Sequence, residues 1–376
     1  MHDLIPAGAG LFLAVLAALH FTGIAVVLIR FRRPPEMEPE EAGAEGISII
    51  RPLCGLENFI EETLRSTFHL NHPNHEILFC VSHGNDAVVP IVHRLIAEHP
   101  GVDAKLLIGD SGVSANPKLN NMHKAWDAAR HDWILIADSN VLMPADHIQR
   151  MKTVWEPDTG VVCSPPAGFV PRNFWAEVEA GFLNTYQARW QCLADSLGYG
   201  FTQGKSMLCR RAVLEAGGGF GALARETAED AAATKIVREL GLKVRLVTEP
   251  LPQPLGFRRW SDVWRRQVRW ARLRRGTFPL WFLPEVFAGS LWALAAAGLA
   301  WAATGHAAVV PILAVAWYGA EAVLAHVAGW PLTWRSVAAW AVRDALLPAL
   351  WVAAWAGDDF EWRGNAMTLA GQGTSP

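Results

Sequence analysis

Three acidic sites and one basic cluster are the parts of this sequence whose residue types could do chemistry. The acidic residues are Asp86, Asp138 and the pair Glu229 and Asp230, and the basic cluster is the RQVRW sequence at 266–270. Asp86 and Asp138 follow short apolar runs, where a buried strand would end. Carboxylates can hold a divalent cation or accept a proton, and guanidinium groups can hold phosphate. This combination suits a site that brings together a nucleoside diphosphate, a metal ion and a nucleophile.

The elements that must position these residues alternate in type along the chain. The expected strands are 47–50, 76–81, 104–108 and 133–137. The expected helices are 90–98, 118–130 and 174–195. The alternation predicts an α/β fold with a mainly parallel sheet covered on both faces. Ligands of such sheets lie beyond the carboxyl ends of the strands, and both Asp86 and Asp138 follow a strand end.

The composition indicates that apolar residues are gathered into segments. Hydrophobic residues make up 51% of the 376 residues while charged residues still make up 18%, so the apolar excess must be concentrated in part of the chain. The formal net charge of -3 argues against a nucleic-acid partner, which would need a clustered basic surface. The five cysteines include no CxxC pair, which favours a reduced cytosolic domain.

The first apolar segment predicts a membrane anchor. Residues 11–29 are nearly uncharged, close to the ~20 residues that cross a bilayer. The basic residues at 30–33 follow this run, which places the next domain in the cytosol by the positive-inside tendency. A cleaved signal peptide is the alternative, but its basic residues would precede the run. Residues 34–46 are rich in Pro, Glu and Gly and predict a solvated linker.

The last part of the chain is apolar again. A basic amphipathic helix at 263–275 suits an anionic membrane surface. The three apolar stretches that follow it are 286–304, 307–326 and 337–356. Arg343 and Asp344 lie inside the last stretch, and charges at membrane depth are costly. The sequence therefore favours two spans plus a re-entrant or interfacial piece.

These motifs, in this order, resemble the ceramide glucosyltransferase family, a membrane-bound branch of the inverting GT-A glycosyltransferases with the pattern D, D, D, (Q/R)xxRW. The resemblance runs from about residue 47 to 275 and includes NPKLNN at 116–121 and QGKSM at 203–207. The sequence departs from the family in the thinner acidic loop SHGND at 82–86. It also reads DSN at 138–140, with one carboxylate where many relatives have a DxD motif with two.

The resemblance implies a fold and an activity. It implies a GT-A domain with N-terminal and C-terminal transmembrane helices, divided as an anchor at 1–33, a linker at 34–46, a cytosolic catalytic domain at 47–257, an interfacial helix at 258–283 and a membrane region at 284–376. The implied reaction transfers glucose from UDP-glucose to the primary hydroxyl of ceramide with inversion, at the cytosolic face of a multi-pass membrane protein. It also implies that a Trp-Arg segment at 362–363 stays near the catalytic face, which three full crossings after a cytosolic domain would prevent.

Donor binding is expected from several residues. The resemblance implies that Asp86 accepts hydrogen bonds from the uracil or ribose and that Lys118 lies near the diphosphate. A divalent cation, Mg²⁺ or Mn²⁺, usually neutralises the departing diphosphate, and Asp138 could supply a hard oxygen ligand. The alternatives are a solvated lysine at a helix start for Lys118 and a capping residue in a loop for Asp138.

Inversion needs a base for the acceptor hydroxyl, and Asp230 is the candidate. An apolar neighbourhood and the adjacent Glu229 would raise its pKa toward a useful value. The alternative is that both carboxylates open a helix that continues through 234–240, where they would offset the helix dipole. Glu229 is expected to be structural.

Arg266 and Arg269 lie three residues apart on one helical face and could grip the diphosphate while Trp270 packs at the site. The alternative is a polybasic membrane-surface helix, because further arginines surround them at 258, 259, 265, 272, 274 and 275.

Other readings remain. Within the same class, the chain could transfer N-acetylglucosamine or another hexose to a hopanoid or another lipid, or be a processive polysaccharide synthase, which should have more spans. From a different class, it could be a nucleotide-sugar sensor or a transporter subunit, although no internal repeats are visible. The sequence GKS at 204–206 resembles the end of a P-loop, but the required glycine is Tyr199. The densest histidine cluster, at 69–75, reads as a Pro/Asn turn.

Overall fold

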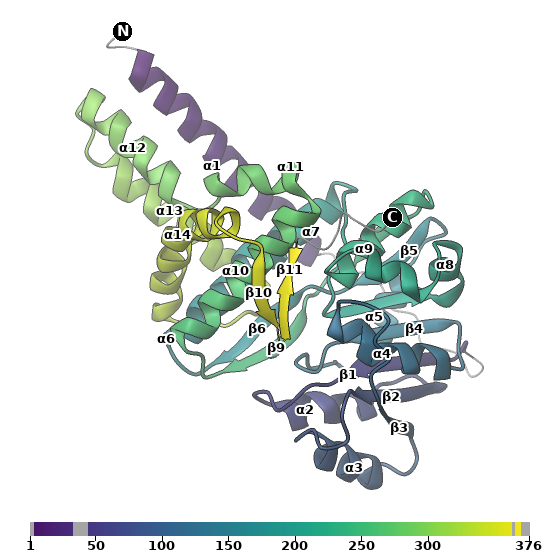
Figure 1. The fold of residues 1–376 in the computed structure, drawn as a ribbon. Helices are drawn as coiled ribbons and strands as arrows, with labels where there is room; N and C mark the ends of the chain where they lie inside the picture. The colour runs from purple at the N-terminus through teal and green to yellow at the C-terminus, as the bar shows by residue number, and fades with distance from the viewer. Residues whose placement is uncertain (1–3, 33–43, 363–364, 370–376) are drawn as a thin grey trace. The chain divides into compact units, whose positions relative to one another are not determined.

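The computed structural model describes residues 4–32, 44–362 and 365–369, which fall into two compact units (Figure 1). We call them the sheet unit, 34–167, 194–254 and 359–376, and the helical unit, 1–33, 168–193 and 255–358. The predicted linker at 34–46 lies mostly outside the described residues, and the predicted domain boundaries stay a prediction.

Among the described residues, the main sheet of the sheet unit has seven strands in the order β3-β2-β1-β4-β7-β5-β8. Their bounds are β1 Ile47–Pro52, β2 His75–Val81, β3 Asp103–Ile108, β4 Trp133–Ala137, β5 Thr159–Cys163, β7 Ser206–Arg210 and β8 Lys243–Leu246. The first four are parallel, β5 and β8 are parallel to each other, and β7 runs antiparallel to β4 and β5. The four predicted strands and the mainly parallel sheet are confirmed.

Helices cover both faces of this sheet, which explains why its central strands are near-continuous apolar runs. Their bounds are α2 Ile60–Arg65, α3 Val89–Glu98, α4 Pro117–Ala128, α5 His147–Thr153, α8 Arg211–Ala216 and α9 Glu229–Glu239, with 3₁₀ turns η1 Ser66–His69 and η3 Phe220–Arg225. Along β2, Phe79 joins the core with Val92 of α3, whereas Leu78 joins the opposite core with Met122 of α4 and Ile236 of α9. The period of two along each strand therefore builds two cores, one on each face.

The helical unit contains the segments predicted to meet the membrane. Its bounds are α1 Leu4–Phe31, α6 Phe174–Gly181, a π-helical segment η2 Phe182–Ala188, α7 Arg189–Ser196, α10 Trp260–Thr277, α11 Pro279–Phe282, η4 Leu283–Phe287, α12 Leu291–Thr304, α13 Val309–Val327 and α14 Trp334–Trp355. The predicted helix at 174–195 is confirmed as one run, which the π-helical segment interrupts. Two short strand pairs complete the chain, β6 Pro166–Pro171 with β9 Leu251–Gly256, and β10 Asp359–Trp362 with β11 Asn365–Thr368.

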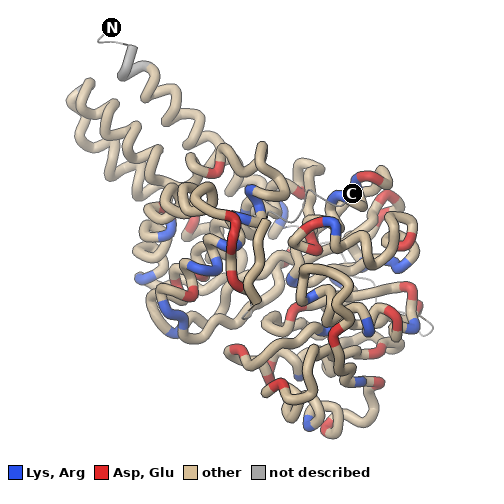
Figure 2. Tube along the Cα trace, in the orientation of Figure 1, with Lys and Arg blue, Asp and Glu red and all other residues tan. Residues whose placement is uncertain are grey.

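Three described helices are long and apolar enough to cross a membrane, at Gly8–Phe31, Val309–Val327 and Trp334–Trp355. A fourth span is possible if Pro279–Phe287 and Leu291–Ala303, which meet at a 44° bend, count as one. The helices α1 and α12 are almost free of charged residues (Figure 2). The sequence favoured two spans and a re-entrant piece for the three apolar stretches after residue 285. The bend lies in the first of these stretches, 286–304.

The charges in the last stretch, which argued against a full span, are neutralised inside the helical unit. The Arg343 guanidinium lies 2.9 Å from a Glu321 carboxylate oxygen and 2.7 Å from an Asp344 oxygen, and all three side chains are buried. Arg343 also donates to Thr185 Oγ1 at 2.6 Å. A cation with two carboxylates and a hydroxyl around it can be tolerated in a helix of this kind.

Candidate active site

Asp138 and Lys205 face each other across an antiparallel strand pair. The register of β4 with β7 pairs Ala137 with Ser206, so the next residue of one strand lies beside the preceding residue of the other. The Asp138 amide donates to the Lys205 carbonyl at 3.0 Å. Lys205 Nζ lies 2.8 Å from Asp138 Oδ2 and donates to Asn140 Oδ1 at 3.0 Å. Sequence analysis missed Lys205, and the only signal for it was its place in the QGKSM motif.

Lys118 is a buried cation between two carboxylates. It lies in the first turn of α4, where Asn116 caps the helix by accepting from the Lys118 amide at 2.8 Å. Lys118 Nζ lies 2.7 Å from Asp138 Oδ1 and 2.6 Å from Glu229 Oε1, and it donates to the Gly204 carbonyl at 3.0 Å. Only 8% of Lys118 is exposed, so it is not the solvated lysine of the alternative interpretation.

The two lysines decide the charge state of Asp138. Burial alone would disfavour its carboxylate, but the ammonium groups of Lys118 and Lys205 outweigh burial and hold the pKa of Asp138 well below its usual range. Burial likewise disfavours the Lys118 ammonium, and the carboxylates of Asp138 and Glu229 reverse this and raise the pKa of Lys118. Both groups are therefore charged at neutral pH.

Asp230 belongs to the same network through Gly204. It lies in the first turn of α9, where Ala228 takes the N-cap position. The Gly204 amide donates to Asp230 Oδ2 and the Ala231 amide to Oδ1, both at 2.8 Å. Burial, together with the neighbouring Glu229 carboxylate, raises the pKa of Asp230 to about 6. A Cβ on Gly204 would lie 3.1 Å from Asp230 Oδ2, so glycine permits this close approach.

Glu229 ties the ends of α4 and α9 together. Its Oε2 accepts from Asn116 Nδ2 at 3.1 Å while its Oε1 meets Lys118 at 2.6 Å. Asn116 Nδ2 also donates to the Thr227 carbonyl at 3.1 Å. Glu229 is only 7% exposed, and its structural role stays a prediction.

Asp86 forms a different set of hydrogen bonds. Its two carboxylate oxygens accept from the Gly55 amide at 3.1 and 2.9 Å, and Oδ1 also accepts from the Val88 amide at 2.9 Å. It thereby holds the loop that follows β1 against the loop that follows β2. A carboxylate has further acceptor positions, so these bonds leave room for the predicted contact with a nucleoside.

The basic cluster lies on α10 of the helical unit. Arg266 forms an ion pair with the fully buried Glu179, and Arg258 Nε lies 3.3 Å from the second oxygen of the same carboxylate. Trp270 packs beside the apolar cluster of Ala176, Ala180, Leu183 and Leu255. The structure brings Lys118, Asp138 and Asp230 into one network in the sheet unit. It describes Arg266 and Trp270 within the other unit.

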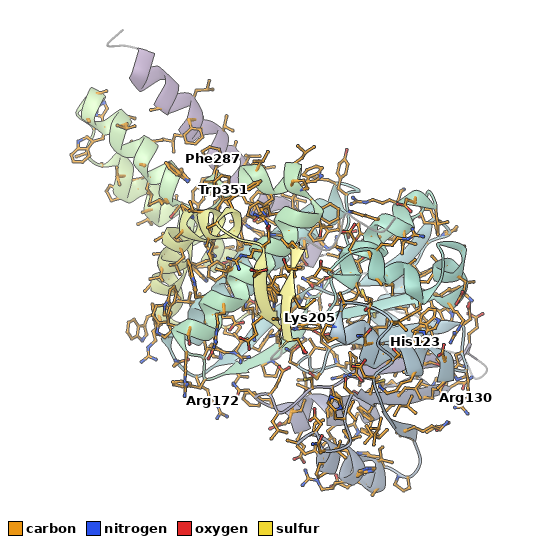
Figure 3. All side chains as sticks on the ribbon, viewed as in Figure 1. His123, Arg130, Arg172, Lys205, Phe287 and Trp351 are labelled. Atoms are coloured by element: carbon orange, nitrogen blue, oxygen red, sulfur yellow. The ribbon has the colours of Figure 1, made fainter. Side chains whose placement is uncertain are left out.

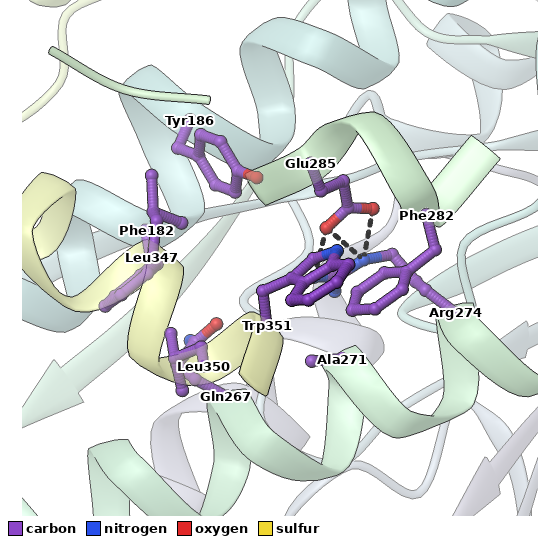
Figure 4. Close-up of a pocket in the computed structure, with 10 residues that line it drawn as sticks. All are labelled: Phe182, Tyr186, Gln267, Ala271, Arg274, Phe282, Glu285, Leu347, Leu350 and Trp351. Atoms are coloured by element: carbon purple, nitrogen blue, oxygen red, sulfur yellow. Dashed lines mark hydrogen bonds and ion pairs between the residues drawn. The ribbon is translucent and has the colours of Figure 1, made fainter. Parts of the chain in front are cut away.

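The helical unit also contains a pocket with about 290 Å³ of empty space, including its open part (Figure 4). It is lined by Phe182, Tyr186, Gln267, Ala271, Arg274, Phe282, Glu285, Leu347, Leu350 and Trp351. On one wall, Arg274 Nε donates to both carboxylate oxygens of Glu285 and Arg274 Nη2 donates to one of them, at 2.8 to 3.1 Å. The pocket is apolar on most sides and polar on one.

The oxygen atoms around Asp138 fit a divalent cation in chemistry, although the described residues contain no group of three or more His, Cys, Asp or Glu side chains arranged to hold one. Asp138 Oδ2 and Asn140 Oδ1 both lie within 3.0 Å of one cation, the Lys205 ammonium. Hard oxygens are the ligands that Mg²⁺ and Mn²⁺ prefer. Asp138 and Asn140 would be the protein residues that hold such an ion, and oxygens of the donor and of water would supply its other ligands.

The chain is similar in sequence to two ceramide glucosyltransferases. Ceramide glucosyltransferase 1 of Caenorhabditis elegans is 29% identical over 279 residues, which are 74% of this chain and 59% of that protein. Ceramide glucosyltransferase 3 of the same organism is 26% identical over 346 residues, 88% of this chain and 74% of that protein. The chain thus spans somewhat over half of the first relative's length.

Among solved structures, a mannosyltransferase from Pyrobaculum calidifontis, in complex with GDP-Man and Mn²⁺, is similar with a TM-score of 0.52. The matched region covers 93% of this chain and 98% of the mannosyltransferase, at 18% sequence identity. This likeness supports a shared GT-A fold. The model of glycosyl transferase family 21 matches residues 13–375. With nearly the whole sequence matched, the chain belongs to glycosyl transferase family 21.

Proposed function

We propose that this protein transfers glucose from UDP-glucose to the primary hydroxyl of ceramide, with inversion, at the cytosolic face of a membrane. The observation that carries the proposal is the network of Lys118, Asp138, Lys205 and Asp230 beyond the carboxyl end of β4 and the start of β7. Open sheets bind their ligands beyond the carboxyl ends of the strands. The names of the similar proteins support the sugar and the lipid. The apolar helices support an acceptor that never leaves the membrane.

Asp230 acts as the base in this proposal. In an inverting transfer the acceptor hydroxyl attacks the anomeric carbon from the side opposite the diphosphate, and its proton must be removed as the new bond forms. A carboxylate whose pKa is raised to about 6 is mostly ionised at neutral pH and is still a better proton acceptor than an ordinary aspartate. The two amide bonds from Gly204 and Ala231 hold it in place.

The donor diphosphate is held by cations in this proposal. Lys118 and Lys205 supply two ammonium groups at the sheet end, and Asp86 binds the uracil or ribose. When Mg²⁺ or Mn²⁺ is bound, with Asp138 and Asn140 as its protein ligands, it neutralises charge on the leaving diphosphate.

The RQVRW cluster stays a predicted part of donor binding, by its place in the family's motif. Arg269 contacts the diphosphate and Trp270 packs beside it. Arg266 is the third member, and its ion pair with Glu179 fixes the orientation of α10 as well. The orientation with the sheet unit in the cytosol follows from the basic residues after the first span.

The test is transfer of labelled sugar by the full chain in detergent, with Mg²⁺ or Mn²⁺ present. UDP-glucose and UDP-N-acetylglucosamine are offered with ceramide and with a hopanoid, using wild type, Asp230→Asn and a matched control, Asp127→Asn, at an exposed carboxylate. We expect glucosylceramide from wild type and the control, and a loss of at least about 100-fold with Asp230→Asn.

Two results would count against this proposal. Transfer to the hopanoid alone would move the assignment to another lipid acceptor. Nucleotide binding by a folded protein that glycosylates no lipid would reject the enzyme and favour a nucleotide-sugar sensor.

A further inference from the structure

Lys205 occupies the position between the two oxygens that suit a divalent cation. Its ammonium nitrogen lies 2.8 Å from Asp138 Oδ2 and 3.0 Å from Asn140 Oδ1. Lys205 is labelled in Figure 3 on the strand-rich part of the molecule. The protein therefore carries its own monovalent cation at the place where the sequence predicts a metal ion.

This contact is built into the sheet. Lys205 immediately precedes β7, and the Asp138 amide donates to its carbonyl at 3.0 Å, so the antiparallel pairing of β4 with β7 fixes where its side chain begins. Lys205 is 9% exposed and Asn140 is 7% exposed. The ammonium group of a surface lysine can exchange its protein partner for water. A buried ammonium between two oxygens must leave its buried position to reach water, so it is held much more firmly.

The charges around Asp138 leave little place for a second cation. Lys118 already lies 2.7 Å from Asp138 Oδ1, so the single carboxylate has an ammonium on each oxygen. Lys118 is also paired with Glu229. A divalent cation added to this set would meet the Lys205 ammonium at contact distance, where like charges repel strongly.

We infer that Lys205 is an internal competitor for the divalent cation and delays metal binding until the nucleotide is present. The inference rests on the proposed function, because it takes Asp138 as the metal ligand. A nucleoside diphosphate brings new negative charge, which can accept both the displaced ammonium and the metal ion. The site then binds metal and donor together, and binds metal weakly when empty.

The experiment measures Mn²⁺ binding directly, by the loss of the free-ion signal in electron paramagnetic resonance, on the full chain in detergent. Wild type is compared with Lys205→Met, which keeps the length of the side chain and removes its charge, and with Lys205→Arg, which keeps the charge. Lys243→Met is the matched control. Lys243 also forms an ion pair with an aspartate, with 2.7 Å between its Nζ and an Asp158 carboxylate oxygen, but this pair is not part of the site. Each protein is titrated with and without UDP.

We expect Lys205→Met to bind Mn²⁺ at least about tenfold more tightly than wild type in the absence of UDP, because a unit charge at contact distance has been removed. Lys205→Arg and Lys243→Met should not gain affinity. Equal or weaker Mn²⁺ binding by a folded Lys205→Met would overturn the inference.

The wild type gives a second test that needs no variant. UDP should tighten Mn²⁺ binding at least about tenfold, and by linkage Mn²⁺ should tighten UDP binding by the same factor. Mn²⁺ binding that UDP leaves unchanged, or no Mn²⁺ binding in any sample, would overturn the inference. The readout is metal binding, so the two ideas can fail separately. Coupled binding of UDP and Mn²⁺ without sugar transfer would reject the proposed function alone. Sugar transfer without coupled binding would reject the inference alone.

Discussion

Asp230 is a carboxylate whose surroundings make it a usable base near neutral pH. Burial and the adjacent Glu229 carboxylate disfavour its charged form, while amide bonds from Gly204 and Ala231 limit that effect. The ordinary pKa of an aspartate is about 3.9. In the folded protein the pKa of Asp230 is about 6, so its protonation state changes within a range that enzyme assays can reach.

The pH dependence of transfer should show this group. A base must be deprotonated to act, so we expect kcat/KM to fall as pH decreases through about 6. The measurement is kcat/KM for UDP-glucose from pH 4 to 8, which extends about two units to each side of the expected midpoint. A profile that stays flat across pH 6 would argue against Asp230 as the base.

The same pKa has an opposite effect on folding. Because the pKa in the folded state is raised above the unfolded value, folding favours the protonated carboxyl. This contribution to stability is fully present below about pH 4 and is lost as pH rises through about 6. The proposed role of Asp230 as a base and its contribution to stability therefore favour different pH ranges.

At the scale of the elements, the described helices of the membrane region depend on one buried ion cluster. Arg343 of α14 contacts Glu321 of α13 and its own neighbour Asp344, at 2.9 and 2.7 Å. Arg343 Nη1 also donates to the Gly181 carbonyl at 3.2 Å, at the end of α6. One side chain thus contacts three helices of the helical unit.

We expect Arg343→Met to lower the free energy of unfolding by about 3–5 kcal/mol, because it leaves two buried carboxylates without their cation. The measurement is the unfolding of the purified chain in detergent. Arg335→Met, at the exposed start of the same helix, is the control and should change stability by no more than about 0.5 kcal/mol. Equal free energies of unfolding for the two variants would mean that the ion cluster does not stabilise the helical unit.

How much the sequence could predict also depends on the elements. The strands β1 to β4 were predicted because each contains a short apolar run, which is a local signal, although β3 is partly exposed and only the other three are buried. The strands β5, β7 and β8 were not predicted. The place of β7 is set by antiparallel pairing with β4, about 70 residues away along the chain, which no local pattern reveals. Lys205 was missed for the same reason, whereas Asp138 follows directly from the end of β4.

The central segment 174–196 shows a second limit. Its apolar pattern predicted one long helix, and the helix is there, but the π-helical turn at Phe182–Ala188 was not foreseen. A π segment adds a residue to one turn and shifts the faces of the two flanking helices. It supplies Phe182 and Tyr186 to the pocket of the helical unit.

At the scale of the whole molecule, the orientation across the membrane can be tested with a native thiol. Cys54 is exposed in the loop after β1, whereas the four other cysteines, all among the described residues, are buried. A membrane-impermeant maleimide should therefore report on Cys54 alone, and so on the side of the membrane that holds the sheet unit.

We expect labelling in inverted membrane vesicles and none in intact cells, because the sheet unit is proposed to lie in the cytosol. Mass spectrometry of the labelled chain gives the measurement, and Cys54→Ser is the control that should abolish labelling. Labelling in intact cells would reverse the orientation, and with it the access of the site to cytosolic UDP-glucose.

The bend of 44° between Pro279–Phe287 and Leu291–Ala303 has a consequence for how the chain is made. If this broken pair enters and leaves the membrane on one side, only α13 and α14 cross after the catalytic residues, and two crossings return the chain to its starting side. The strand pair of β10 and β11 groups with the sheet unit, and two crossings would keep it on the same side of the membrane as the rest of that unit. With that topology, β10 and β11 could join their unit only after α13 and α14 had been inserted.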